Sequence, residues 1–251
     1  MSGTPPILLV TGATGAIGGE IAAQAAESGR RIAVHGRSED SVASAIDQLR
    51  LRCPEASLFP APADFDRPDA ITKLIDGLAA AGPIGSVIHC AVSGAPGVTG
   101  GFPTTNPSAF AVLADATLAR FQQLCFAALP HLAIQGGTIV TLAADSGRFA
   151  APNQSLLAGA YGGMMSFVRS LALEVAHHGV RVHCLSPSFV EGTPIFDAFA
   201  GSGSRAESAR NRAGLGLPQP KDIAPIALFL CGPGAAKITG QIISINGGLN
   251  A

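Results

Sequence analysis

The chain has 251 residues, of which 47% are hydrophobic and 13% are charged, and its formal net charge is −1. That length suits one large α/β domain with a sizeable core, and the near-zero charge gives no electrostatic reason to expect nucleic acid or an anionic membrane as a partner. Because so few residues are charged, we expect an oligomer to cover part of the surface.

The sequence indicates no targeting, membrane-spanning or metal-binding segment. The N-terminus lacks a basic segment followed by an apolar stretch, and we find no apolar run of membrane-spanning length. The five cysteines form no Cys-x-x-Cys pair, and the six histidines show no metal-ligand spacing. We therefore expect a cytoplasmic protein with reduced, buried thiols and no metal site.

The predicted elements begin with a strand, a glycine turn and a helix. Residues 7–10 are apolar, residues 11–18 read TGATGAIG, and apolar residues then recur at helical spacing as far as Gly29. Glycines at this spacing let a pyrophosphate approach the backbone, and the start of the helix offers it free N–H groups and a positive dipole end. The stretch predicts a dinucleotide-binding turn.

The next predicted strand, residues 31–35, indicates which dinucleotide is bound. An acidic side chain about twenty residues past the turn would hold the ribose 2′-hydroxyl of NAD(H). Here Gly36 stands near that place, and Arg37 and Ser38 follow it. An arginine suits a 2′-phosphate, so we expect NADP(H) rather than NAD(H). The alternative is that Arg37 is a solvated loop residue.

Strands and helices alternate along the rest of the chain. Further strands are predicted at residues 57–61, 86–91, 138–142, 181–185 and 241–245. Further helices are predicted at residues 41–52, 68–80, 109–132, 154–176 and 221–230. This alternation predicts a single Rossmann-like domain over residues 1–251, with a doubly wound parallel sheet of about seven strands and helices on both faces. The Gly- and Ser-rich segment 186–216 is predicted to be a substrate-side lid.

Over essentially its full length the sequence resembles the short-chain dehydrogenase/reductase family. Residues 11–18 resemble that family's TGxxx[AG]xG turn, residues 170–174 and 180–182 its fifth helix and sixth strand, and residues 245–248 its C-terminus. The resemblance places Asp64 at the adenine amino group and Pro187 beside the nicotinamide. The implied cofactor contacts are Gly12, Thr14, Gly15, Ala16, Ile17, Gly18, Arg37, Ser38, Asp64, Phe65, Ala91, Pro187 and Val190.

The catalytic residues that the resemblance implies are replaced. Family members use a tyrosine as general acid/base, a lysine four residues later that depresses its pKa, a serine that orients the carbonyl, and an asparagine that holds a water. Those four places are occupied here by Leu157, Tyr161, Ala144 and Thr117. Tyr161 is the one tyrosine of the chain and Met165 follows it at the lysine spacing, so no Tyr-x-x-x-Lys pair exists. The family's carbonyl reduction is therefore not supported.

Further replacements fall on the cofactor side. The family's Asn-Asn-Ala-Gly is His89-Cys90-Ala91-Val92 here, and Ser188 replaces the glycine after Pro187. A β-branched side chain at Val92 would narrow the cleft beside the cofactor. A site that binds no dinucleotide is therefore the alternative to one that binds NADP(H).

We weighed three functions. The leading hypothesis is a non-catalytic or divergent family member that acts by ligand binding or as an oligomer subunit. A second is an NADP(H)-dependent oxidoreductase that acts on a small apolar carbonyl or alcohol, with Tyr161 as a substitute acid. A third is a non-redox acid/base enzyme that uses His89 and Asp145, with Ser146 nearby. The alternative for these side chains is a role in packing and turn capping.

The residues expected around the cleft allow either a ligand or a filled site. They are mostly apolar: Phe102, Phe149, Leu156, Leu157 and Phe189. The resemblance also implies that the helices at residues 109–132 and 154–176 pack against those of a neighbouring subunit. We expect a homodimer or homotetramer, or a mixed oligomer with an active family member.

Overall fold

Seven parallel strands form one sheet in the order β3-β2-β1-β4-β5-β6-β7. The computed structural model describes residues 4–91, 100–200 and 205–250. The strands are β1 (Ile7–Thr11), β2 (Arg31–Gly36), β3 (Leu58–Pro62), β4 (Ile84–His89), β5 (Gly137–Leu142), β6 (Val180–Pro187) and β7 (Ile242–Ile245). The order reverses between β1 and β4, as in a doubly wound sheet, so the predicted fold class is confirmed.

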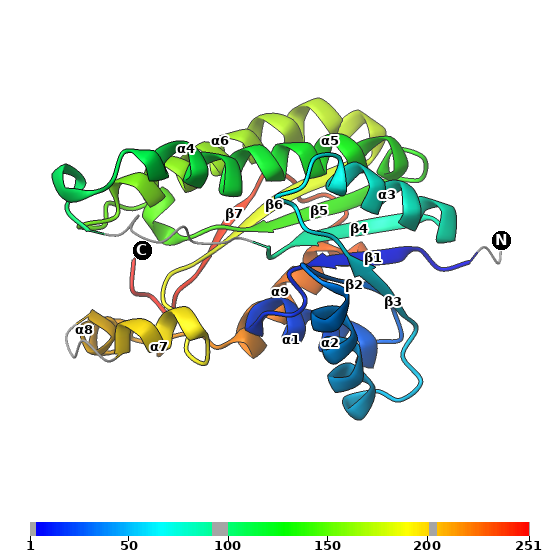
Figure 1. Cartoon of the computed structure of the whole chain (residues 1–251), viewed down its shortest axis with the longest axis horizontal. Coiled ribbons are helices and arrows are strands. Elements are labelled where there is room, and N and C mark those ends of the chain that lie inside the picture. The colour runs from blue at the N-terminus through cyan, green and yellow to red at the C-terminus, as the bar shows by residue number, and fades with distance from the viewer. Residues whose placement is uncertain (1–3, 92–99, 201–204, 251) are drawn as a thin grey trace.

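Helices cover both faces of this sheet (Figure 1). On one face lie α1 (Ala16–Glu27), α2 (Glu39–Arg52) and α9 (Pro220–Leu230), and on the other lie α3 (Ala70–Ala81), α5 (Arg120–Leu132) and α6 (Ser155–Val175). Successive side chains of a strand point to opposite faces of the sheet. Leu8 and Val10 of β1 therefore pack in the core on the first face, and Ile7 and Leu9 pack in the core on the second.

The predicted helix at residues 109–132 is interrupted. It consists of α4 (Ser108–Ala114), a π-helical turn (Asp115–Ala119) and α5. Thr117 lies inside the π-turn, where its Oγ1 donates a hydrogen bond to the Leu113 carbonyl at 2.7 Å. A π-turn depends on the backbone pairing of a few residues, and hydrophobic periodicity does not reveal it.

Two short helices lie within the segment predicted to be a loop. They are α7 (Pro194–Ala200) and α8 (Arg205–Arg212), so the absence of regular structure expected for residues 186–216 is wrong there. The buried residues of α8 are small, and Ala209 packs with Ala213 and Leu249 from the C-terminal tail. Helices this short are stabilised by such long-range packing, which local sequence does not show.

One helical stretch passes the length and composition test for a membrane span. Among the described residues it covers Ser155–His178, which is long and apolar enough by length and composition alone, although Arg169 and Glu174 interrupt its apolar sequence. Six side chains of its α6 part are buried in the domain: Met164, Met165, Val168, Leu171, Ala172 and Val175. This helix is a core helix of the α/β domain, where one face packs against β6 and its neighbours.

Candidate dinucleotide site

The turn after β1 is packed so closely that two of its glycines have no room for a side chain. Gly12 has a φ of +67°, and a Cβ there would lie 2.8 Å from the Ala91 nitrogen. A Cβ on Gly18 would lie 2.2 Å from the Gly12 carbonyl oxygen. These contacts hold the turn between the end of β4 and the start of α1, as a dinucleotide-binding turn requires.

The start of α1 is free to bind an anion. The N-cap residue Gly15 makes no side-chain capping bond, and the first turn contains no acidic residue. Its N–H groups and the positive end of the helix dipole therefore remain available to a pyrophosphate. By this test the residues present fit the phosphate part of a dinucleotide.

A buried histidine that the sequence analysis did not single out lies beneath this turn. The Gly12 N–H donates to His35 Nδ1 at 3.0 Å, and His35 Nε2 lies 3.0 Å from the Ala63 carbonyl oxygen. The ring also packs against Phe65, with 4.3 Å between the centroids. A histidine at the end of a strand has no sequence motif that would mark this arrangement.

The end of β2 leaves no space for an acidic side chain at Gly36. A Cβ there would lie 2.5 Å from Thr14 Cγ2, 3.0 Å from Ser41 Oγ and 3.1 Å from Val42 Cγ2. Ser41 is itself fixed, because it forms the capping box of α2 with Ser38. The place from which a carboxylate would reach a ribose 2′-hydroxyl is therefore filled by protein.

Arg37 extends into solvent beside this filled position. Its side chain is 68% exposed, and its Nε lies 3.9 Å from Asp64 Oδ1. Arg67 approaches the other oxygen of Asp64 at 3.8 Å. Exposed pairs at these distances are weak, so Arg37 can turn to a phosphate at little cost. Asp64 and Phe65 thus lie beside Arg37, on the loop after β3, where the resemblance places the adenine.

The residues expected near the nicotinamide lie at the ends of β4 and β6. The Ala91 N–H donates to Thr11 Oγ1 at 3.4 Å, Pro187 is the last residue of β6, and Val190 is buried. Ser188 is half-buried. Val92, which was expected to narrow the cleft, lies outside the described residues.

The four positions that the resemblance assigns to catalytic residues lie on α6 and at two turns that contact it. Thr117 lies in the π-turn, Ala144 precedes the 3-10 turn Asp145–Gly147, and Leu157 and Tyr161 lie on α6. A Cβ on Gly147 would lie 2.7 Å from the Tyr161 carbonyl carbon, so this turn packs directly onto the helix. Burial, with a smaller contribution from Cys184, raises the pKa of Tyr161 to about 12.

No cation activates this phenol within residues 4–91, 100–200 and 205–250. No hydrogen bond, cation–π contact or ion pair of that part of the chain joins Tyr161 to a lysine or arginine. A phenol with so high a pKa stays protonated at neutral pH and is a weak proton donor.

His89 and Asp145, which were considered as an acid/base pair, belong to separate networks. His89 Nδ1 lies 2.8 Å from Thr11 Oγ1, and its ring stacks on Phe121. Asp145 accepts hydrogen bonds from four side chains of later segments: Ser186, Ser244, Asn246 and Asn250. No hydrogen bond among the described residues joins the two: His89 Nε2 is buried without a hydrogen-bond partner, and Asp145 is occupied by the later segments. Ser146 is buried next to Asp145.

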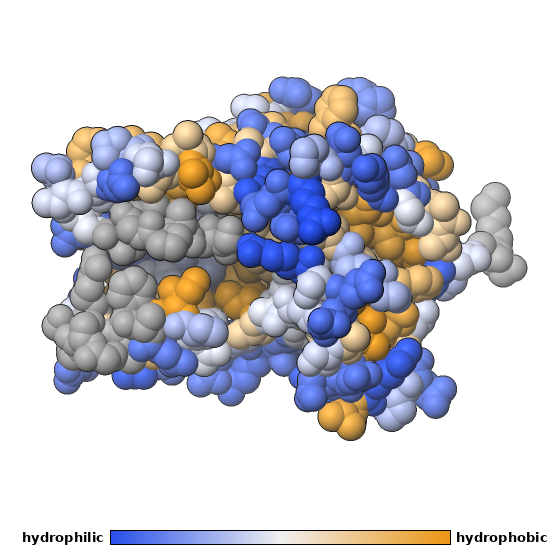
Figure 2. All heavy atoms as spheres, viewed as in Figure 1, coloured by the Kyte–Doolittle hydropathy of each residue, from blue (hydrophilic) through white to orange (hydrophobic). Residues whose placement is uncertain are grey.

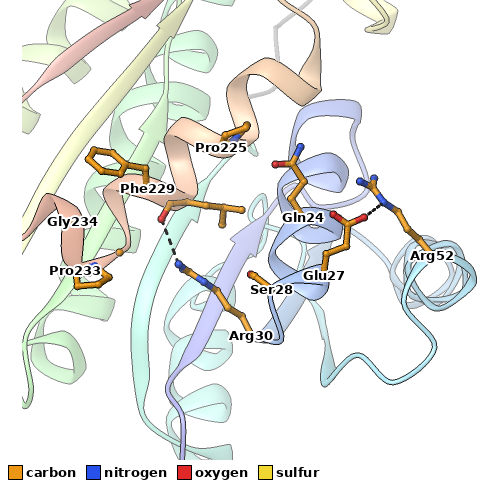
Figure 3. A pocket seen from close by; sticks show the side chains of 11 residues that line it. Gln24, Glu27, Ser28, Arg30, Arg52, Pro225, Phe229, Pro233 and Gly234 are labelled. Carbon is orange, nitrogen blue, oxygen red and sulfur yellow. Dashed lines mark hydrogen bonds and ion pairs between the residues drawn. The ribbon is translucent and has the colours of Figure 1, made fainter.

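Two surface grooves lie away from His89 and Asp145, and the second is bordered by Phe65 and Arg67 of the loop after β3. One, of about 620 Å³, runs between α1, the end of α2 and α9; there Arg52 pairs with Glu27, and Arg30 reaches the Leu228 carbonyl beside Phe229 (Figure 3). The other, of about 900 Å³, lies between α3, α5 and α6 and contains the exposed Phe126.

The molecule is also hollowed between the α4 end and the α7–α8 end, with hydrophobic side chains at the opening (Figure 2). Of the expected cleft residues, Phe102 stacks on Phe110 of α4 with 5.7 Å between the ring centroids. Phe189 packs edge-on against Phe196 of α7.

Comparison with known proteins gives matches over nearly the whole chain. The family model described as enoyl-(acyl carrier protein) reductase matches residues 12–250. The 3-oxoacyl-[acyl-carrier-protein] reductase FabG of Chlamydia muridarum is 28% identical over 96% of both chains. A putative ketoacyl reductase of Streptomyces coelicolor is 29% identical over 97% of this chain and 96% of its own.

Solved structures agree with these matches. A variant of actinorhodin polyketide ketoreductase, crystallised with NADPH, has a TM-score of 0.87 and 26% identity, and the alignment covers 98% of this chain and 97% of that one. A short-chain dehydrogenase/reductase from Mycobacterium ulcerans has a TM-score of 0.91 at 22% identity, over 99% of this chain and 91% of its own. At 22% identity, the likeness to the Mycobacterium ulcerans protein shows the fold alone.

Proposed function

The chain belongs to the short-chain dehydrogenase/reductase family, and from that premise we propose that it binds NADP(H) without the family's tyrosine–lysine proton transfer. It is an oxidoreductase-like protein in which the phosphate-binding end of the site is intact and the catalytic end is rewritten. The observation that carries this proposal is which residues of α6 stand at the catalytic positions. By the resemblance, Leu157 takes the place of the tyrosine and Tyr161 takes the place of the lysine. Burial raises the pKa of the Tyr161 phenol.

Carbonyl reduction needs a hydride and a proton. The nicotinamide would supply the hydride when bound, and the protein must supply the proton to the developing alkoxide. Leu157 carries no transferable proton, and Ala144 has no hydroxyl to orient a carbonyl. The residues of this chain therefore favour a binding or assembly role over the family's usual reduction.

The choice of NADP(H) rests on the end of β2. Gly36 is enclosed by Thr14, Ser41 and Val42, and the exposed Arg37 beside it pairs only loosely with Asp64. A guanidinium group matches a phosphate dianion well, and nothing acidic at position 36 would repel it. The NADPH in the structure of the related actinorhodin polyketide ketoreductase supports the same choice.

A second candidate function is an NADP(H)-dependent oxidoreductase with a substitute acid. The relatives favour it, because one of the two described above is a 3-oxoacyl-[acyl-carrier-protein] reductase and the other a putative ketoacyl reductase. Tyr161 is the candidate acid, and the expected apolar lining suits a small apolar carbonyl or alcohol. The third hypothesis, a His89 and Asp145 pair, loses its support because these side chains lie in separate networks.

We also propose that the groove between α5 and α6 binds a second subunit, either a copy of this chain or an active family member. Phe126 and Leu173 on these helices are 83% and 81% exposed. Large apolar side chains that are so exposed on neighbouring helices are typical of protein interfaces. Size-exclusion chromatography with light scattering measures the mass, and a monomer at micromolar concentration would contradict this part of the proposal.

Calorimetric titration with NADP⁺ and NAD⁺ tests the proposed function. We expect NADP⁺ to bind and NAD⁺ to bind more weakly; failure of both to bind overturns the proposal. NADPH consumption across a panel of apolar ketones and quinones then separates the two candidates. We expect no turnover above a protein-free control. Turnover that is abolished in Tyr161→Phe would establish the second candidate instead.

A further inference from the structure

The His35 side chain joins two loops that also bond to the backbone of β2. The Ala13 N–H donates to the His35 carbonyl at 2.9 Å, and the Ala63 N–H donates to the Gly36 carbonyl at 3.0 Å. The side chain of His35 is 3% exposed and lies between the turn after β1 and the loop after β3. One ring nitrogen bonds to the backbone of the first loop, at Gly12, and the other bonds to the backbone of the second, at Ala63. The ring face packs against Phe65 of the second loop.

The two backbone partners fix the state of the ring. The Gly12 N–H is a donor, so Nδ1 must act as an acceptor, and the Ala63 carbonyl is an acceptor, so Nε2 must carry the hydrogen. Only the neutral imidazole in this one tautomer satisfies both. A protonated ring would set two N–H groups against each other at Gly12.

The position of Gly12 makes this hydrogen bond consequential. Gly12 has a positive φ and lies against the Ala91 backbone, and its carbonyl oxygen lies against Gly18 at the start of α1. Its own N–H is occupied by His35. A shift of Gly12 would therefore displace the start of α1, whose uncapped N–H groups are the ones available to a pyrophosphate.

We propose that His35 is a positioning residue for the dinucleotide, because its neutral ring holds the phosphate-binding turn in shape and couples it to the adenine-side loop. The proposal rests on the proposed function, namely that this turn binds NADP(H). His35 touches no phosphate itself. It acts through Gly12 on one side and through Ala63, next to Asp64, on the other.

The surroundings of His35 favour the neutral ring. Burial lowers its pKa to about 4, partly offset by the hydrogen bond to Ala63. The other titratable groups around the ring are His89 on β4, also buried, and Asp64 after β3, which Arg37 and Arg67 approach. His89 opposes a positive charge on His35, since two imidazolium ions would repel each other.

Two substitutions separate the two hydrogen bonds. The Oδ1 atom in His35→Asn matches Nδ1 in bond count and keeps an acceptor for the Gly12 N–H. The Nε2 atom in His35→Gln matches the imidazole Nε2 and keeps a donor for the Ala63 carbonyl. Calorimetric titration with NADP⁺ at pH 7.5 measures the effect, with His131→Asn on α5 as a control histidine away from the turn.

We expect the dissociation constant for NADP⁺ to rise less than threefold in His35→Asn and His131→Asn, and about tenfold in His35→Gln, as the loss of one buried hydrogen bond implies. Hydrogen exchange of the Gly12 amide in the cofactor-free protein gives a second readout: its protection should survive in the Asn variant and be lost in the Gln variant. Equal affinities of the Asn and Gln variants, together with equal Gly12 protection, overturn the proposal.

If His35→Gln does not fold, the pH dependence of NADP⁺ affinity in the wild type and in His35→Asn still tests the proposal. Between pH 6 and pH 4 the wild-type ring becomes protonated, while Asn at this position does not titrate. With a pKa of about 4, about half of the His35 rings are protonated at pH 4. We therefore expect the wild-type affinity for NADP⁺ to fall about twofold more than that of His35→Asn over this interval, and parallel profiles overturn the proposal. A wild type that binds no NADP⁺ would refute the proposed function alone, since Gly12 exchange still tests His35.

Discussion

The two ends of the site lie on the same sheet edge but are constrained in different ways. At the phosphate end, backbone touches backbone: Gly12 meets Ala91, and Gly18 meets Gly12. At the catalytic end, the Gly147 turn packs closely on Tyr161 of α6, and on our proposal the side chains that would do chemistry differ from those of the family. A binding turn is thus specified by its backbone, whereas catalysis depends on a few replaceable side chains.

The largest expected effect comes from restoring those side chains. We predict that Ala144→Ser, Leu157→Tyr and Tyr161→Lys together raise NADPH-dependent reduction of an apolar ketone by about 10²–10⁴-fold, the usual range for a positioned general acid. The matched control carries Leu157→Phe in place of Leu157→Tyr and lacks only the phenol oxygen. Equal rates in the two variants, with NADP⁺ binding retained, would show that the frame itself has changed.

The next effect tests the backbone constraint at the other end. In Gly18→Ala the new Cβ would lie 2.2 Å from the Gly12 oxygen and 2.7 Å from its carbon. Since both are backbone atoms, we predict a loss of about 3 kcal/mol in the free energy of unfolding, together with loss of NADP⁺ binding.

Gly77→Ala on α3 is the control for this substitution, because a Cβ there meets nothing within 4 Å. It should gain about 0.5–1 kcal/mol from helix propensity. Urea denaturation measures both variants. A Gly18→Ala protein as stable as the wild type would contradict the idea that backbone packing defines this end.

The features that the sequence predicts are those that depend on residues close together in the chain. The glycine turn and the strands were predictable because each depends on neighbours in sequence: an apolar run, a turn, a helical period. His35 and Asp145 were not, since their partners lie far along the chain. Asp145 receives bonds from Ser186 and Asn246, which are 41 and 101 residues away. Helix α8 depends likewise on contacts with the C-terminal tail.

A smaller effect is the pH dependence of stability that the buried His89, at the end of β4, produces. Burial, together with His35, lowers the pKa of His89 to about 3, against about 6.5 in an unfolded chain. Unfolding therefore takes up a proton between these values, and stability falls as the pH drops below 6.5. From pH 7 to pH 5 we predict a loss of roughly 2 kcal/mol from this residue.

His89→Leu isolates that contribution. The variant loses the bond to Thr11 at every pH, so only the pH-dependent part of the difference reports the imidazole. Urea unfolding at pH 7 and pH 5 measures it. The variant should lose roughly 2 kcal/mol less than the wild type over this interval, and an equal loss in both would assign the acid sensitivity to other groups.

At the ribose end the expected effect is about tenfold. Arg37→Ser removes an exposed guanidinium that pairs only loosely with Asp64. We predict about tenfold weaker NADP⁺ binding, about 1.4 kcal/mol, with unchanged NAD⁺ binding. Arg67→Ser removes the other arginine near Asp64 and is the control. Equal losses for both cofactors in Arg37→Ser would mean that Arg37 does not face the 2′-phosphate.

The smallest effect tests whether neighbouring side chains occupy the space that a ribose-binding carboxylate at position 36 would need. Gly36→Asp alone should bind NAD⁺ no better than the wild type, because its Cβ would meet Thr14 Cγ2 at 2.5 Å. Thr14→Ser deletes that methyl group and keeps the hydroxyl, so the double variant should bind NAD⁺ a few-fold more tightly. Calorimetry over the cycle of four proteins gives the coupling between the two positions. If Gly36→Asp alone binds NAD⁺ as tightly as the double variant, the side chain at Thr14 rotates aside freely. Selection against NAD⁺ at this end would then rest on the missing carboxylate and Arg37, with no contribution from packing.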